Sequence, residues 1–197
     1  MSSVLSQLQD RINALEDEFE RELAARRRQF RYEVKNRRVK FEAEARKQHK
    51  RLRTGLLRFL RHASILHYIT APVIYALIIP ISLLDLFVTV YQWVCFPVYG
   101  IRRVKRSSYI ALDRRKLSYL NIIEKLNCEF CGYSNGVIAY ASEVASRTEQ
   151  YWCPIKHSRG VRSCHHRYYD FIDYGDGEGF RERAKKLRED VRAEDRS

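Results

Sequence analysis

The sequence predicts a mainly α-helical protein made of four successive segments. Residues 1–53 contain no proline or glycine, and their apolar side chains recur at steps of three and four, as on a helix. Residues 68–99 carry a single formal charge, Asp85, and four of the five cysteines lie between residues 128 and 164. The expected segments are a coiled-coil-like helix with a basic stalk (1–53), an interfacial and apolar segment (54–106), a small α-rich module (107–169), and an acidic turn with a charged C-terminal helix (170–197).

The first segment is expected to be one continuous helix that self-associates. Its apolar residues keep a heptad rhythm for about three repeats, and arginine and lysine become frequent from Arg26 onward. The residues that set this pattern are Leu5, Leu8, Ile12, Leu15, Phe19 and Leu23, followed by Phe30, Val34 and Phe41. A homo-oligomer held by this helix is the expectation, and an amphipathic helix packed on the protein's own body is the alternative.

The second segment predicts insertion into a membrane. Residues 54–67 alternate apolar and basic side chains on a helical period, as a helix in the headgroup layer would. The apolar run 68–99 would make a helix of about 48 Å, too long for one upright crossing of a hydrocarbon core of about 30 Å and too short for two. Pro80 lies near its middle, which favours a re-entrant hairpin.

The flanks of the apolar run favour the same topology. Arginine and lysine are in excess on both sides, in "RKQHKRLR" before the run and "GIRRVKR" after it, so both termini are expected in the cytoplasm. One tilted span with an interfacial extension is the alternative. Asp85 is costly in hydrocarbon unless it is paired or hydrated, so it is a candidate functional residue, with a hydrated hairpin tip as the plainer explanation.

The net positive charge of the chain limits the kinds of partner that it could bind. A net charge of +13 suits either nucleic acid or anionic lipid, but the densest basic stretch adjoins the apolar run. That placement favours an anionic membrane and weighs against nucleic acid. The N-terminus lacks the apolar core of a cleavable signal peptide, so membrane targeting is expected to come from the internal segment.

The third segment predicts a structural metal site. "NCEFCGYSNG" spaces Cys128 and Cys131 as in a metal knuckle, with Gly132 for the tight turn, and "YWCPIKHSRGVRSCHH" offers Cys153 and His157. Four protein ligands around zinc imply structure more than catalysis. Iron bound by the same residues and a redox dithiol are the alternatives. The reserve ligands are Cys164, His165 and His166.

Helices are expected on both sides of the knuckle, and a charged helix is expected at the C-terminus. The intervening turn carries Asp170, Asp173, Asp176 and Glu178, whose spacing does not fit an EF-hand. Residues 112–157 resemble a family of uncharacterised bacterial inner-membrane proteins with the signature NCxxCGYxNG followed by EQYWCPIKH. The resemblance covers about a quarter of the chain and implies a bacterial cytoplasmic membrane, without an activity or a partner.

The function expected from these features is non-enzymatic. The sequence has no glycine-rich phosphate loop, no GxSxG elbow and no HExxH motif. The leading hypothesis is a membrane-anchored scaffold that self-associates and displays a cytoplasmic zinc-binding docking module. The alternatives are a redox or electron-transfer component that uses the cysteines, and a membrane-tethered nucleic-acid binder. No protein client can be named from the sequence.

Overall fold

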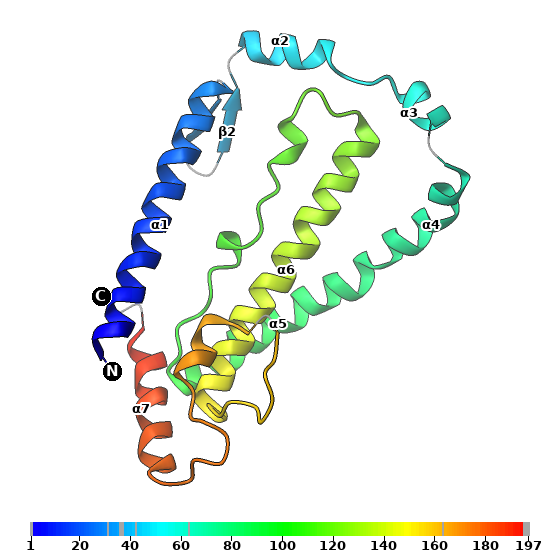
Figure 1. Ribbon diagram of the computed structural model, residues 1–197. Helices are drawn as coiled ribbons and strands as arrows, with labels where there is room; N and C mark the ends of the chain where they lie inside the picture. The colour runs from blue at the N-terminus through cyan, green and yellow to red at the C-terminus, as the bar shows by residue number, and fades with distance from the viewer. Residues whose placement is uncertain are drawn as a thin grey trace. The chain divides into compact units, whose positions relative to one another are not determined.

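The structure is a computed structural model that describes residues 2–30, 32–35, 38–41, 43–62, 64–162 and 164–194. It is mainly helical, as predicted (Figure 1). The chain forms two compact units, each discontinuous in sequence: residues 1–62 with 113–127 make unit 1, and residues 63–112 with 128–197 make unit 2. The chain therefore leaves unit 1 before the apolar run and returns to it afterwards.

Unit 1 begins with a long helix that ends earlier than expected. Helix α1 (Ser2–Gln29) is followed by two short antiparallel strands, β1 (Tyr32–Lys35) and β2 (Arg38–Phe41). The prediction of one continuous helix over residues 1–53 is therefore wrong. From residue 32 the apolar and charged residues alternate with the period of two that a strand requires, and the register pairs Val34 with Val39.

The rest of unit 1 joins segments from before and after the apolar run. Helices α2 (Ala43–Arg51) and α3 (Leu56–His62) precede the run, and residues 113–127 follow it. The rings of His49 and Tyr119 meet edge to face with centroids 5.2 Å apart. Helix α6 (Ile122–Trp152) begins in this unit with a capping box, in which Asn121 and Glu124 each accept a hydrogen bond from the other's backbone N–H at 3.0 and 2.8 Å.

Unit 2 begins with the apolar helix. Helices α4 (Ile65–Ala76) and α5 (Ile78–Tyr99) are separated only by Leu77, which keeps a right-handed helical conformation. Together they form a helical stretch of 35 residues that is long and apolar enough to cross a membrane, within the part of the chain that the structure describes. The predicted hairpin is not confirmed, because the chain does not reverse at Pro80. The proline removes one helical hydrogen bond and interrupts the helix at Leu77.

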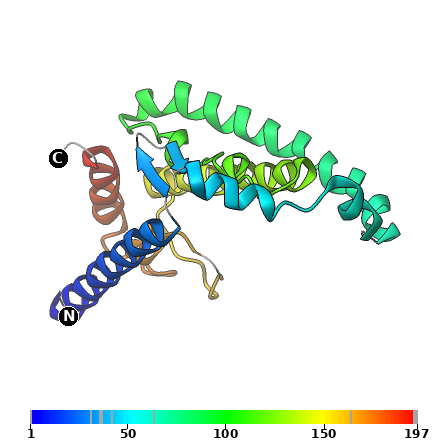
Figure 2. The same cartoon turned by 90° about the horizontal axis from the view of Figure 1, so that it is seen from above.

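The core of unit 2 lies between α5 and α6, which run side by side (Figures 1 and 2). Helix α7 (Phe180–Ala193) adds its buried Val191 to this core. Gly100, at a φ of 73°, ends α5 and turns the chain into residues 101–112, which run back along the helix pair. The buried apolar side chains that form the core are Phe96, Ile101, Val104, Tyr140, Val144 and Val191.

Candidate functional site

The most exposed apolar surface of unit 2 lies on α4 and α5. Residues 65–84 contain no aspartate, glutamate, lysine or arginine, and all of them are exposed except Ala71 and Ile81, which are half-buried. Beyond residue 84 only one side of α5 stays exposed. We call this side the exposed face of α5; it consists of Leu83, Leu86, Phe87, Val90, Trp93, Val94 and Val98.

The opposite side of α5 is held by polar contacts, of which the strongest is at Asp85. Its carboxylate accepts hydrogen bonds from Arg106 Nε at 2.8 Å and Nη2 at 2.5 Å, and from the Tyr133 hydroxyl at 2.9 Å. The acid predicted as costly in hydrocarbon is thus paired, and this pairing fixes α5 to the 101–112 segment and to α6. A bidentate arginine supplies both charge and geometry, so these contacts orient all three segments.

A second polar contact lies further along α5 at Gln92. Its Oε1 accepts from the backbone N–H of Val104 at 2.8 Å, and its Nε2 donates to the Tyr140 hydroxyl at 2.5 Å. Tyr91 and Thr148 join the two helices by a hydroxyl–hydroxyl bond of 3.0 Å. Buried polar groups in α5 therefore have partners, which is the condition for burying them without a large loss of stability.

The first half of the predicted metal site is helical. Cys128 and Cys131 lie within α6, so the knuckle turn predicted at Gly132 is wrong. Cys131 and Cys153 are 22 residues apart across one uninterrupted helix, a rise of about 33 Å. The structure therefore does not bring the four predicted ligands together. No group of three or more histidine, cysteine, aspartate or glutamate side chains within the described residues is arranged to hold a metal ion.

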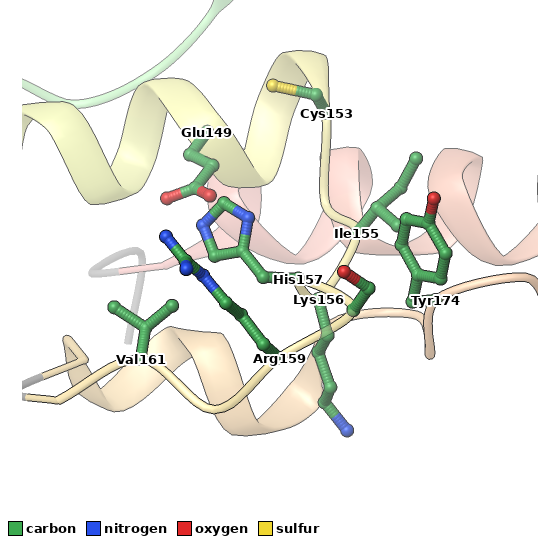
Figure 3. Close-up of a pocket in the computed structure, with 9 residues that line it drawn as sticks. Glu149, Cys153, Ile155, Lys156, His157, Arg159, Val161 and Tyr174 are labelled. Carbon is green, nitrogen blue, oxygen red and sulfur yellow. The ribbon is translucent and has the colours of Figure 1, made fainter.

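The second half of the predicted site lies at an open pocket of about 510 Å³ after the end of α6 (Figure 3). Cys153, His157 and Glu149 all line it. Figure 3 shows the His157 ring close to Glu149, while the Cys153 side chain lies along the helix end, apart from that ring. The C-x3-H spacing thus places both residues around one cavity without directing them to one point.

The reserve ligands have other partners or positions. The Cys164 thiol donates to the Val161 carbonyl at 3.0 Å, and His165 Nε2 lies 2.9 Å from the Glu149 carboxylate. His166 is exposed at the start of a 3₁₀ helix (His166–Asp170). The redox alternative gains no support from these positions, because Cys153 lies about 33 Å along α6 from Cys131.

An ion-pair network holds the region where zinc was expected to act. Glu143 accepts from Arg147 Nε at 2.8 Å and from Arg167 Nη2 at 2.9 Å, and Arg167 Nη1 donates to Glu194 at 2.5 Å. Gln150 adds a bond from its Nε2 to the Leu187 carbonyl at 2.9 Å. The network joins α6, the 3₁₀ helix and the C-terminal helix, with two positive and two negative groups in balance.

The electrostatics of this network favour the charged forms. Burial alone would raise the pKa of Glu143, but the hydrogen bonds from Arg147 and Arg167 outweigh burial and hold its pKa below the ordinary value of 4.5. Burial would lower the pKa of Arg167, and its bonds to Glu194 and Glu143 raise it instead. The buried charges are therefore mutually compensated, and removing one of them leaves another without a partner.

The acidic turn forms ion pairs of its own. Asp173 lies 2.9 Å from Lys156, and Asp176 lies 2.7 Å from Arg183. The backbone of Gly179, not a side chain, caps α7. These contacts make the turn a connection between the 153–157 segment and α7.

Comparison of the chain with protein-family models, curated protein sequences and solved structures finds no match. The resemblance of residues 112–157 to bacterial inner-membrane proteins therefore stays a prediction.

Sequence reasoning missed the partners of the buried polar residues. Asp85 stood out as a charge in an apolar run, but Arg106 is one of many arginines and lies 21 residues away. Arg167 follows the histidine pair and carried no signal, although a buried arginine always needs an acceptor. The sequence pattern singled out Asp85, but only the fold identified Arg106 as its partner.

Proposed function

We propose that this chain is a non-enzymatic membrane-anchored scaffold, in which α4 and α5 embed in a lipid bilayer and hold the helical module of unit 2 at its surface. The observation that carries the proposal is the uncharged stretch 65–84, exposed on all sides of the helix. Such a mainly apolar stretch of 20 residues exposed to water would be a strong aggregation hazard, and lipid removes that exposure. The basic residues on both sides of the run suit anionic headgroups on the cytoplasmic face.

The anchor is tested with full-length protein in isolated membranes. We expect it to stay with the membrane after extraction at alkaline pH and to float with vesicles of mixed zwitterionic and anionic phospholipid. Charged substitutions Ile74→Glu and Ile79→Glu together should release it, because each places a carboxylate where an exposed apolar side chain now lies. A wild-type chain that is monodisperse in buffer without detergent would overturn the proposal.

The scaffold part of the proposal depends on α1. Leu15 and Phe19 belong to the predicted heptad pattern, and their side chains are 65% and 63% exposed in the single chain. An apolar stripe that is exposed in the single chain is typical of a helix that packs against a second helix in a coiled coil. Other residues of the pattern, among them Leu5, Leu8 and Ile12, lie where the structure describes no side chains.

Native mass in mild detergent tests self-association. Leu15→Glu with Phe19→Glu should shrink the oligomer, because charged side chains replace the apolar contact. Arg21→Glu is the matched control: it changes the net charge by the same two units on the other side of the helix, and the oligomer should persist. A wild-type mass of one chain would contradict self-association and leave the membrane anchor untouched.

A further inference from the structure

The path of the chain around the apolar helix restricts how that helix can sit in a membrane. Residues 63–112 leave unit 1 and return to it, because unit 1 contains chain from before residue 63 and after residue 112. Within that unit α2 and the 113–127 segment are joined by the contact of His49 with Tyr119. If α4 and α5 crossed the bilayer once, these two segments would lie on opposite sides of it.

The segment that leads back to unit 1, residues 101–121, gives a second argument against a single crossing of the membrane. Residues 101–121 contain only two short 3₁₀ helices, Arg106–Ser108 and Arg114–Lys116, and are otherwise irregular. An irregular chain facing lipid cannot satisfy its backbone N–H and C=O groups, so this segment cannot recross the hydrocarbon to reach unit 1. The apolar helix must enter and leave the membrane on the same side.

The two sides of α5 show how this is possible. The side that carries Asp85 and Gln92 is covered by α6 and by the 101–106 segment, whose Arg106 side chain is still 44% exposed. A charged, partly hydrated arginine cannot lie in hydrocarbon at low cost. The exposed face of α5 is apolar along its whole length, so lipid can cover that face and no other.

We infer that α5 lies in the plane of one leaflet, with its exposed face against the acyl chains and its polar side packed on α6 at the membrane surface. This inference rests on the membrane anchor proposed above. The position of Arg103 agrees with it, because its guanidinium lies 4.3 Å from the centroid of the Trp93 ring, so that this cation lies beside the exposed face of α5, where it can reach lipid phosphates. Helix α4 contains no aspartate, glutamate, lysine or arginine and has no buried residue, so on the other side of the break at Leu77 it is immersed more fully.

Depth measurements on α5 distinguish a helix in the plane from an upright one. Trp152→Phe leaves Trp93 as the only tryptophan, and Leu83→Trp with Trp93→Phe and Trp152→Phe places the probe ten residues earlier on the same face. Quenching by lipids brominated at defined depths should place the two probes within about 5 Å of each other. An upright helix would separate them by about 15 Å, and that result overturns the inference while leaving the anchor intact.

Sidedness and surface variants complete the test. An impermeant reagent should reach tags at both termini from the same side of sealed vesicles, and labelling from opposite sides would overturn the inference. Phe87→Glu with Val94→Glu should lower the vesicle partition coefficient by about tenfold or more. Tyr169→Glu is the control, because Tyr169 is as exposed as Val94 (71% and 63%) but lies outside α4 and α5, and its partition should not change. If the wild-type chain does not bind vesicles, the anchor itself is refuted.

Discussion

Two glycines in α6, four residues apart, give a sharp test of the fold because the same substitution should be tolerated at Gly132 and be less favourable at Gly136. A Cβ built at Gly136 would lie 2.8 Å from the backbone oxygen of Tyr109 and 3.0 Å from the Ile110 Cα. At Gly132 the nearest atom is the Ala111 oxygen at 3.4 Å, close to an ordinary van der Waals contact. Helix α6 passes so close to the returning chain at Gly136 that backbone atoms would have to move.

The magnitudes follow from two contributions. Replacing a helical glycine by alanine stabilises a helix by about 1 kcal/mol, and this gain is common to both variants. Forcing a methyl group into packed backbone costs about 1–3 kcal/mol, and this cost applies only to Gly136→Ala. We expect Gly132→Ala to be neutral or stabilising by up to about 1 kcal/mol, and Gly136→Ala to be about 1–3 kcal/mol less stable than Gly132→Ala.

Thermal unfolding in detergent, followed by circular dichroism, measures the difference. For a chain of this size each kcal/mol shifts the midpoint by about 2–4 °C. The pair also separates a continuous helix from the zinc knuckle predicted from sequence, because a tight turn at Gly132 would make Gly132→Ala the damaging change. Loss of stability in Gly132→Ala with none in Gly136→Ala would refute the reasoning.

Three further predictions concern the module of unit 2. Because the folded-state pKa of Glu143 is lowered, its ionised form stabilises the fold at pH values above the ordinary pKa of 4.5, and this stabilisation is lost as the pH falls through the folded-state pKa. Denaturant titrations at stepped pH should therefore show that acid lowers the free energy of unfolding less in Glu143→Gln than in wild type. Arg167→Ala should destabilise the fold by about 3–5 kcal/mol in chemical denaturation, because it leaves Glu143 with one buried partner fewer, and a loss below 1 kcal/mol would contradict the network. Cys131→Ser and Cys153→Ser should be additive within about 0.5 kcal/mol in a double-mutant cycle, since about 33 Å of helix separates the two positions, whereas a shared metal would give strong coupling.

The sequence by itself determined the mainly helical class and the apolar run, because both depend on patterns within a few turns of chain. It also singled out Asp85, since a lone charge in an apolar run is visible without a fold. The strand pair at 32–41 was visible in principle as a period of two, but the surrounding helical pattern was extended through it. Sequence patterns predict structure reliably where the conformation depends mainly on residues that are neighbours in sequence.

The tertiary structure decided what those residues do. A CxxC spacing occurs both in metal knuckles and in helices, and in this structure Cys128 and Cys131 lie within helix α6. Arg106 lies 21 residues from Asp85 and Arg167 lies 24 residues from Glu143, separations that no local period encodes. The topology inferred for the apolar helix likewise rests on a contact between distant segments, that of His49 with Tyr119, which no local pattern reveals.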